Sequence, residues 1–297
     1  MACVSVHAAF YLWYGTPAVD GAWRHWDHPS MPHWTTSMNL RFPPGVRHQP
    51  PDAPHSPFYP ARGVYSSGDM AVLTEQMSEL ARAGVDSVML SWWGQQGANV
   101  TRDSQGVSTD ERVAAVLEAA ASAGVGVSWH LEPYGGRTPA SIVDDLRYLA
   151  RTYGQHPAVW RSDTTGGRPL VFLYDVSFEH SGNDQQSRDA AGAEWRRVLA
   201  GLRGTDADAM LLSLYIDERD DDFLIEAGID GAYSYFAADG FTHGATAAKW
   251  HAIVERLGAR GKHFVPSVGP GYDDTRIRPW NCLLYTSDAA DEEGSVD

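Results

Sequence analysis

Hydrophobic and polar positions along the chain alternate between two kinds of segment. Seven short runs are almost continuously apolar, which indicates buried β-strands. In the longer segments between them, apolar residues recur every three or four positions, as on one face of a helix. Met70, Leu73 and Met77 share such a face, and Gly84 is a stop signal after it. The predicted strands are residues 4–11, 85–93, 125–134, 169–175, 209–217, 229–236 and 262–272.

The alternation of strands with helical segments is typical of parallel β/α units. Seven consecutive units predict an α/β fold, a (β/α)8 TIM barrel that is incomplete because its eighth strand and helix are missing. An open doubly wound sheet is the alternative, but no glycine-rich phosphate turn follows the first strand. Thr109 is the expected N-cap of one helix, and Pro139 begins the next. The predicted helices are residues 67–84, 108–124, 139–154, 189–202, 221–228 and 244–261.

One long irregular segment, residues 15–68, follows the first predicted strand. It holds nine prolines between Pro29 and Pro60 and three tryptophans, and no helical pattern. A loop of this length is usually functional or disordered, and this one is too aromatic to be disordered. In a barrel, we expect it on the carboxyl-terminal face, over the active site.

Aromatic and acidic residues gather where the predicted strands end, which is where barrel enzymes carry their catalytic residues. A rim of this kind suits a glycoside hydrolase, in which two carboxyl groups flank the bond that is cleaved. The residues alone favour Glu132 together with Asp217 or Glu218, although each acid could instead cap a helix or pair with an arginine. The rim residues are Tyr11, Trp13, Tyr14, Trp92, Trp93, His130, Glu132, Tyr134, Tyr174, Asp175, Tyr215, Asp217, Glu218, Tyr233, Tyr235, Tyr272, Asp273, Asp274 and Arg278.

The composition narrows the choice of partner. The 11 Trp, 13 Tyr and 9 Phe fit either a large core or a surface that stacks on sugar rings. A formal net charge of −15 argues against a nucleic acid or an anionic membrane as partner, and no apolar run is long enough to span a membrane. Cys3 and Cys282 suggest no disulfide framework, and the histidines of the long loop lack metal-ligand spacing. We expect a monomer that needs no metal or cofactor.

Several motifs of the chain resemble those of a known family. They are "VHAAFYLWYGTPAVDGAWRHWDH", "MLSWWG", "WHLEPYGGR", "PLVFLYD", "DGAYSYFAADG" and "FVPSVGPGYDDTRIRPWN". By these motifs the chain is similar to glycoside hydrolase family 99, the endo-α-1,2-mannosidases and endo-α-1,2-mannanases, and the motifs occur in family order across residues 4–281. "HLEPYGGR" resembles the bacterial form, because animal members tend to carry glutamine at the position of Glu132.

The resemblance implies a (β/α)8 barrel that cleaves α-mannan or high-mannose glycans inside the chain, at α-1,2 linkages, with retention and without a metal. In the family mechanism, one Glu acts as base on the substrate's own 2-hydroxyl, which attacks the anomeric carbon and forms a 1,2-anhydro sugar. A second Glu protonates the leaving oxygen and then activates water. The resemblance places this pair in an N-E-W-H-E-like motif beyond Asn281, and the sequence contains no such motif.

Other residues match the family's sugar-binding positions. The resemblance implies that Glu132 contacts the reacting mannose as an assisting carboxylate rather than as the acid. Core packing is the alternative role for each of these residues, and it is most plausible for Trp92 and Tyr134. The expected substrate-binding residues are Tyr14, Trp92, Trp93, Glu132, Tyr134, Tyr235 and Arg278.

The last residues have a different character. Residues 282–297 hold five acids and no base, and "CLLYTSDAADE" can be back-translated into a transposase sequencing adapter. We therefore expect residues 1–281 to be the incomplete catalytic barrel and 282–297 to be a translated library artefact of a metagenomic, bacterial gene. We also expect this polypeptide to be inactive, with a non-catalytic carbohydrate-binding barrel as the alternative function. Without a signal peptide in the sequence, a cytoplasmic location and a secreted or periplasmic one with its leader missing both stay open.

Overall fold

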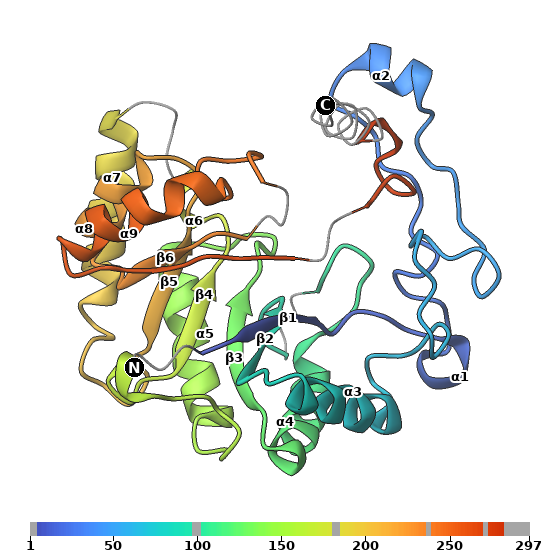
Figure 1. The fold of residues 1–297 in the computed structure, drawn as a ribbon, viewed down its shortest axis with the longest axis horizontal. Helices are drawn as coiled ribbons and strands as arrows, with labels where there is room; N and C mark the ends of the chain where they lie inside the picture. The colour runs from blue at the N-terminus through green and yellow to red at the C-terminus, as the bar shows by residue number, and fades with distance from the viewer. Residues whose placement is uncertain (1–4, 97–101, 180–184, 236–238, 270–272, 282–297) are drawn as a thin grey trace, which may run out of the picture. The chain divides into compact units, whose positions relative to one another are not determined.

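The central feature of the computed structural model is a sheet of seven parallel strands, paired in chain order from β1 to β7 (Figure 1). The structure describes residues 5–96, 102–179, 185–235, 239–269 and 273–281. The expected tail, 282–297, lies outside them. The strands are β1 (His7–Tyr11), β2 (Ser87–Trp92), β3 (Gly126–Leu131), β4 (Leu170–Leu173), β5 (Met210–Leu214), β6 (Gly231–Tyr233) and β7 (His263–Val265).

The sheet is an incomplete barrel, as the sequence predicts. Every residue of β2, β4, β5 and β6 is buried, whereas β1 and β7 each expose a residue, Ala9 and His263. Among the described residues, β1 pairs only with β2 and β7 only with β6. A closed eight-stranded barrel has no such edges, because every strand pairs on both sides.

The predicted helices connect successive strands, and their apolar faces are buried against the sheet. Leu73 and Met77 of α3 are fully buried, in agreement with the predicted helical face. Pro139 opens α5 as expected, and the hydroxyl of Thr138 accepts the Ser141 N–H at 3.1 Å as its N-cap. The helices that accompany the sheet in one compact unit, residues 5–12 and 70–269 of the described chain, are α3 (Met70–Arg82), α4 (Val113–Ala123), α5 (Pro139–Tyr153), α6 (Val176–Glu179), α7 (Gln185–Leu199), α8 (Asp220–Ala227) and α9 (Trp250–Gly258), with 3-10 turns Asp110–Arg112, Asp163–Thr165 and Ala247–Lys249.

The N-cap predicted at Thr109 is wrong. The 3-10 turn Asp110–Arg112 precedes α4, and the Thr109 side chain makes no capping hydrogen bond. Its hydroxyl instead accepts the backbone N–H of Trp93 at 2.9 Å. A contact between distant loops has replaced the local one, which the sequence pattern could not reveal.

The two faces of the sheet contact two separate apolar clusters. The larger one fills the space between the sheet and its helices, and includes Val88, Leu90 and Trp92 of β2. The smaller one lies on the opposite face, where Met210, Leu212 and Leu214 of β5 alternate with Leu211 of the larger cluster. Successive side chains of a strand point to opposite faces, so the inner face of the barrel can be read at every second residue.

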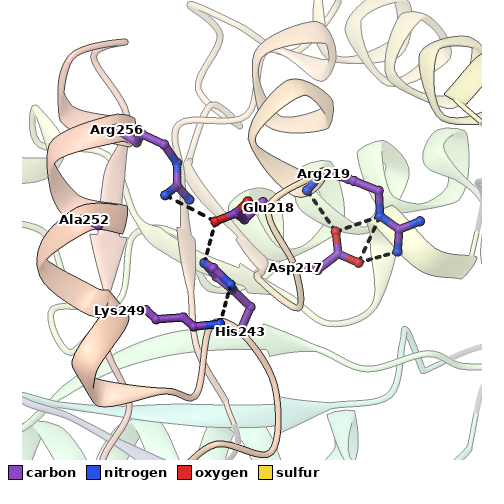
Figure 2. Close-up of a pocket in the computed structure, with 7 residues that line it drawn as sticks. All are labelled: Asp217, Glu218, Arg219, His243, Lys249, Ala252 and Arg256. Atoms are coloured by element: carbon purple, nitrogen blue, oxygen red, sulfur yellow. Dashed lines mark hydrogen bonds and ion pairs between the residues drawn. The ribbon is translucent and has the colours of Figure 1, made fainter.

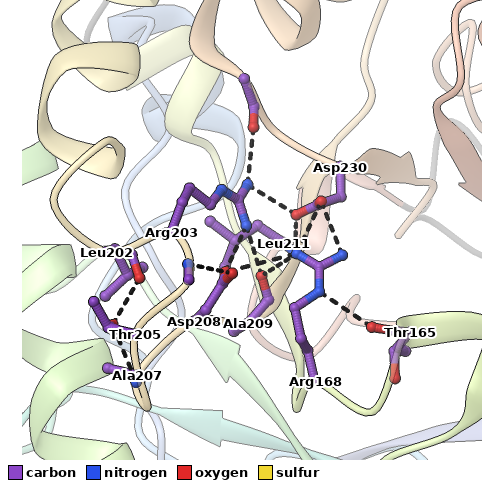
Figure 3. A network of polar contacts seen from close by, with 12 residues as sticks. Thr165, Arg168, Leu202, Arg203, Thr205, Ala207, Asp208, Ala209, Leu211 and Asp230 are labelled. Atoms are coloured by element: carbon purple, nitrogen blue, oxygen red, sulfur yellow. Dashed lines mark hydrogen bonds and ion pairs between the residues drawn. The ribbon is translucent and has the colours of Figure 1, made fainter.

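An ion-pair network joins the segments that enter β4, β5 and β6 (Figure 3). Asp230 Oδ1 accepts both terminal nitrogens of Arg168 at 3.1 Å, and Asp230 Oδ2 accepts Arg203 Nη2 at 2.9 Å. Asp208 Oδ1 accepts Arg203 Nη1 at 2.9 Å. Burial raises the pKa of Asp208, but the Gly204 backbone N–H, which donates to Asp208 Oδ2 at 2.9 Å, and the hydrogen bond and charge of Arg203 outweigh it and hold the pKa below its usual value. Polar groups at the amino ends of barrel strands contribute to stability rather than catalysis.

A second compact unit combines residues 13–69 with residues 273–281, and it is described here by itself. The Met31 N–H donates to the Ile277 carbonyl at 2.8 Å, and Arg276 donates to the Pro54 carbonyl. The segment expected to lack helices contains two short ones, so that expectation is wrong. The expectation that residues 15–68 cover the active site stays a prediction. The elements of this second unit are α1 (Pro17–Asp20), α2 (Thr36–Arg41) and the 3-10 turn Pro279–Asn281.

No helix in the described part of the chain is long and apolar enough to cross a membrane.

Candidate active site

The Glu132 carboxylate lies directly after β3 and is only 6% exposed. Its Oε1 accepts the Ser91 hydroxyl at 2.7 Å and lies 2.9 Å from His130 Nδ1. The Glu132 backbone N–H donates to the Trp92 carbonyl at 3.0 Å, which fixes the main chain as well. Among the described residues, Oε2 has no hydrogen-bond partner. One carboxylate oxygen is therefore held in place and the other can accept a hydrogen bond from a ligand.

His130 links this carboxylate to the next strands of the inner face. Its Nε2 lies 2.8 Å from the hydroxyl of Tyr233, which is almost fully buried. A carboxylate oxygen only accepts, so His130 Nδ1 carries a ring proton and donates to Glu132 Oε1. In this tautomer Nε2 accepts the hydrogen bond of the Tyr233 hydroxyl, which keeps its proton because burial raises the pKa of Tyr233. Hydrogen bonds at both ring nitrogens thus fix the orientation of the imidazole.

Two further tyrosines, Tyr174 and Tyr235, lie against His130, and Tyr11 contacts Tyr235. The ring of Tyr235 stacks on the imidazole with centroids 5.4 Å apart, and it meets Tyr174 edge-on at 5.3 Å. The hydroxyls of Tyr11 and Tyr235 are 2.6 Å apart. Burial raises the pKa of Tyr235 and of Tyr11. Tyr11, Tyr174 and Tyr235 keep part of their surface exposed, so the cluster offers neutral hydroxyls and aromatic faces next to Glu132.

Trp92 and Trp93 have different surroundings. Trp92 is completely buried in the cluster between sheet and helices, and its Nε1–H donates to Asp110 Oδ1 at 2.8 Å. This placement favours the core-packing role for Trp92. Trp93 is partly exposed, and the alternation along β2 assigns it to the same face as Ser91. Trp93 therefore remains a candidate for sugar contact.

Tyr134, two residues after Glu132, contacts α5 through its hydroxyl. Its hydroxyl donates to Asp145 Oδ2 and lies 2.9 Å from Ser141 Oγ. Gln95, which follows β2, donates to Asp145 Oδ1 at 2.9 Å. Burial raises the pKa of Asp145 to about 6, although both hydrogen bonds oppose the shift. Asp145 thus joins the two loops that carry Trp93 and Glu132.

A stability prediction follows from the sign of this shift. A carboxyl with a raised pKa in the folded state binds its proton more tightly there, so acidification through pH 6 should stabilise the fold. The Asp145→Asn variant lacks this group, and between pH 7.5 and 5 the wild type should gain about 1 kcal/mol relative to it. Urea unfolding of both proteins at the two pH values measures the difference. A difference that does not change with pH would contradict the assignment.

Tyr14 and Arg278 belong to the second unit. The ring of Tyr14 packs against Trp26 with centroids 4.3 Å apart, and stacks on His55 at 6.0 Å. Burial and neighbouring histidines lower the pKa of His55 to about 4. Arg278 Nη1 lies 2.6 Å from Asp274 Oδ2, which orders the guanidinium. That these residues join the site around Glu132 stays a prediction.

The pairing of Glu132 with Asp217 or Glu218, favoured from the residues alone, finds no support in the geometry. Asp217 forms an ion pair with Arg219, and the hydrogen bonds from that arginine lower the pKa of Asp217. The Glu218 side chain is 66% exposed. Both line a separate cleft whose lining does not include Glu132. In the described part of the chain, no three His, Cys, Asp or Glu side chains are grouped so as to hold a metal ion.

Ser91, Asp110 and Asp145 support the site and were not predicted from the sequence. Ser91 lies on the inner face of β2 and could have been found by counting alternate residues back from Trp93. Asp110 and Asp145 come from the helical layer, and their contacts join segments far apart in the sequence. Nothing in the local pattern distinguishes these two acids from ordinary surface carboxylates.

A half-barrel of parallel strands with a buried carboxylate and aromatic side chains at the carboxyl ends has its candidate site where barrel enzymes carry theirs. The sequence profile of glycosyl hydrolase family 99 matches residues 3–291. The chain therefore belongs to glycosyl hydrolase family 99, as the motifs predicted.

Individual relatives agree with this assignment. The chain is 37% identical over 283 residues to the human glycoprotein endo-alpha-1,2-mannosidase-like protein, covering 93% of this chain and 58% of that protein. It is 34% identical over 278 residues to the rat glycoprotein endo-alpha-1,2-mannosidase, again covering 93% of this chain and 58% of the relative. The structure of the endo-alpha-mannosidase of this family from Bacteroides thetaiotaomicron superposes with a TM-score of 0.78 at 34% identity, covering 93% and 74% of the two chains. The chain thus spans less than two thirds of the length of these curated relatives.

Proposed function

We propose that the site around Glu132 binds α-1,2-linked mannosides of α-mannan or high-mannose glycans, as part of an endo-acting, retaining mannosidase or mannanase. The observation that carries the proposal is the Glu132 carboxylate, buried and fixed through Oε1 with Oε2 left to accept a hydrogen bond. Membership of the family and the names of the relatives supply the substrate class.

The chemistry of the surrounding groups supports a sugar ligand. A carboxylate oxygen accepts a hydroxyl proton strongly, and in a buried site its charge favours the positive charge that develops at the anomeric carbon. The faces of Tyr174 and Tyr235 suit the apolar C–H side of a pyranose ring, and their hydroxyls suit its polar rim. Trp93, Tyr134, Tyr14 and Arg278 are the further binding residues that we propose.

Hydrolysis in this proposal depends on a second set of residues. The route through a 1,2-anhydro sugar needs one Glu to deprotonate the 2-hydroxyl and another to protonate the leaving oxygen. The printed sequence has no N-E-W-H-E-like motif to provide them. We therefore propose that this polypeptide binds the glycan and does not cleave it. We also propose that it binds as a monomer.

Calorimetric titration with α-1,2-linked and α-1,6-linked manno-oligosaccharides tests the substrate class. The α-1,2-linked ligand should bind more tightly, and prolonged incubation with α-1,2-mannan should release no oligosaccharide. Equal affinity for both linkages would contradict the proposed specificity. Oligosaccharide release would contradict the proposed inactivity, and proton NMR of the first product would then reveal whether the anomeric configuration is retained.

A non-catalytic carbohydrate-binding barrel is the second candidate. It is favoured by the combination of an ordered aromatic site with a sequence that lacks the expected Glu pair. Sequencing the source DNA past the codon for Asn281 separates the two candidates. A downstream N-E-W-H-E-like motif in frame supports the hydrolase, and a natural stop codon without it supports the binding barrel.

A further inference from the structure

A cleft of about 590 Å³ opens beside β5, and its lining includes none of the residues assigned to the sugar site (Figure 2). Its walls come from the segment after β5, from the segment after β6 and from α9. Because the carboxyl ends of parallel strands lie at one edge of a sheet, the cleft opens at the same edge as Glu132. The lining residues are Asp217, Glu218, Arg219, His243, Lys249, Ala252 and Arg256.

The segment that carries His243 is fixed tightly against the end of β5. The backbone N–H groups of His243 and Gly244 both donate to the Ile216 carbonyl, at 3.0 and 3.4 Å. A Cβ atom at Gly244 would lie 2.2 Å from the Tyr215 carbonyl oxygen. Only glycine permits this approach, so the position of His243 is built into the fold.

Two hydrogen bonds hold the Arg256 guanidinium in place and leave its third nitrogen facing the cleft. Its Nε donates to Asp221 Oδ2 at 2.8 Å and its Nη2 donates to the Tyr215 hydroxyl at 2.8 Å. Both partners are buried. The remaining nitrogen, Nη1, lies 3.8 Å from Glu218 Oε1, which is beyond hydrogen-bond distance.

His243 presents a second donor. Lys249 Nζ lies 3.1 Å from His243 Nδ1, and because an ammonium can only donate, Nδ1 accepts and the ring proton is on Nε2. Nε2 lies 3.4 Å from Glu218 Oε1 without hydrogen-bond geometry, and among the described residues it makes no hydrogen bond. Burial and the nearby Lys249 lower the pKa of His243, in agreement with a neutral ring.

Glu218 is the weakly held member of this group. Its side chain is 66% exposed, and its contacts with His243 and Arg256 are both longer than 3.3 Å. Asp217 is already neutralised by Arg219. Arg256 is likewise paired with buried Asp221. The Lys249 ammonium and the Nη1 donor of Arg256 therefore face the loosely held Glu218 carboxylate, in a protein whose formal net charge is −15.

We propose that this cleft binds an anionic oxo group, a phosphate or carboxylate, through Lys249, His243 and Arg256, with Glu218 displaced into solvent. An exposed ion pair is worth little, so the displacement costs little. No Trp, Tyr or Phe is among the lining residues, which disfavours stacking of a neutral sugar. The anion is either free in solution or a substituent on a glycan. The site does not depend on the mannoside proposal.

Titration of the wild type and two variants with inorganic phosphate in low-salt buffer tests this site, because one variant should bind phosphate more tightly and the other more weakly. Glu218→Gln removes the competing internal carboxylate and should tighten phosphate binding about fivefold, whereas Lys249→Ala should weaken it about tenfold. Glu226→Gln is the matched control, because it removes an exposed carboxylate of α8 that pairs with Arg196 of α7. It should leave the phosphate affinity unchanged. Arg256 is left intact because its loss would strand buried Asp221 and Tyr215.

Four ligands distinguish the source of the anion. Mannose 6-phosphate binding more tightly than inorganic phosphate assigns the site to a phosphorylated glycan, equal binding assigns it to the free anion, and preference for glucuronate assigns it to a carboxylate. Each of these results supports the anion site. Binding of unmodified mannose without phosphate, no phosphate binding at millimolar concentration, or an affinity that Glu218→Gln and Lys249→Ala leave unchanged would overturn it.

Discussion

Replacing Asp110 by alanine should lower the free energy of unfolding by about 3 kcal/mol, the largest loss of stability expected from any substitution near the site. Asp110 is 2% exposed, and its carboxylate accepts four donors. Trp92 Nε1 and the Tyr153 hydroxyl donate to Oδ1, and the Gln96 N–H and the Tyr148 hydroxyl donate to Oδ2. Without the carboxylate, the buried indole N–H of Trp92 has no acceptor.

Urea denaturation measures this loss. Asp110→Asn keeps one acceptor oxygen and should lose less than the alanine variant. Asp144→Ala removes a carboxylate on α5 that is 68% exposed and should change stability by less than about 0.5 kcal/mol. An alanine variant of Asp110 as stable as the Asp144 control would show that the four hydrogen bonds do not hold this loop.

Replacing Glu132 by alanine should weaken binding of an α-1,2-linked manno-oligosaccharide about a hundredfold. The substitution removes the free acceptor Oε2 and the charge, and leaves Ser91 and His130 without their shared partner. Glu132→Gln keeps the oxygen that Ser91 and His130 contact, so it should retain affinity within about tenfold. Calorimetry on the two variants separates the hydrogen-bonding role from the charge.

The control for this series is Glu118→Gln on α4, whose side chain is 73% exposed. It should bind the oligosaccharide as the wild type does. Thermal melting of each variant shows whether Glu132→Ala is still folded. Affinity unchanged in a folded Glu132→Ala protein would remove Glu132 from the proposed site.

The strands and helices of the half-barrel could be predicted because their hydrophobic periods are undisturbed. The ends of the strands were less predictable. The run from 262 to 272 indicated one long strand, but β7 ends at Val265 because Pro266 has no N–H to donate to a neighbouring strand. In the same way, β3 ends at Leu131, two residues before Pro133.

The candidate site was predictable where the two-residue period of a strand applies. The residues on the inner face, Ser91, Trp93, His130 and Glu132, follow that period. The same count places Trp92 on the helical side of the sheet, although its position at the end of a predicted strand had grouped it with the rim residues. The roles of Asp110 and Asp145 depend on tertiary contacts between helices and loops, which no local pattern encodes. Asp217 follows β5 as expected, but its neighbour Arg219 neutralises it.

A crystal structure of the protein with a bound α-1,2-linked manno-oligosaccharide tests the central claim most directly. We predict a mannose hydroxyl within hydrogen-bond distance of Glu132 Oε2, with the sugar ring against Tyr174 or Tyr235. A sugar bound elsewhere, with no contact to Glu132, would contradict the account.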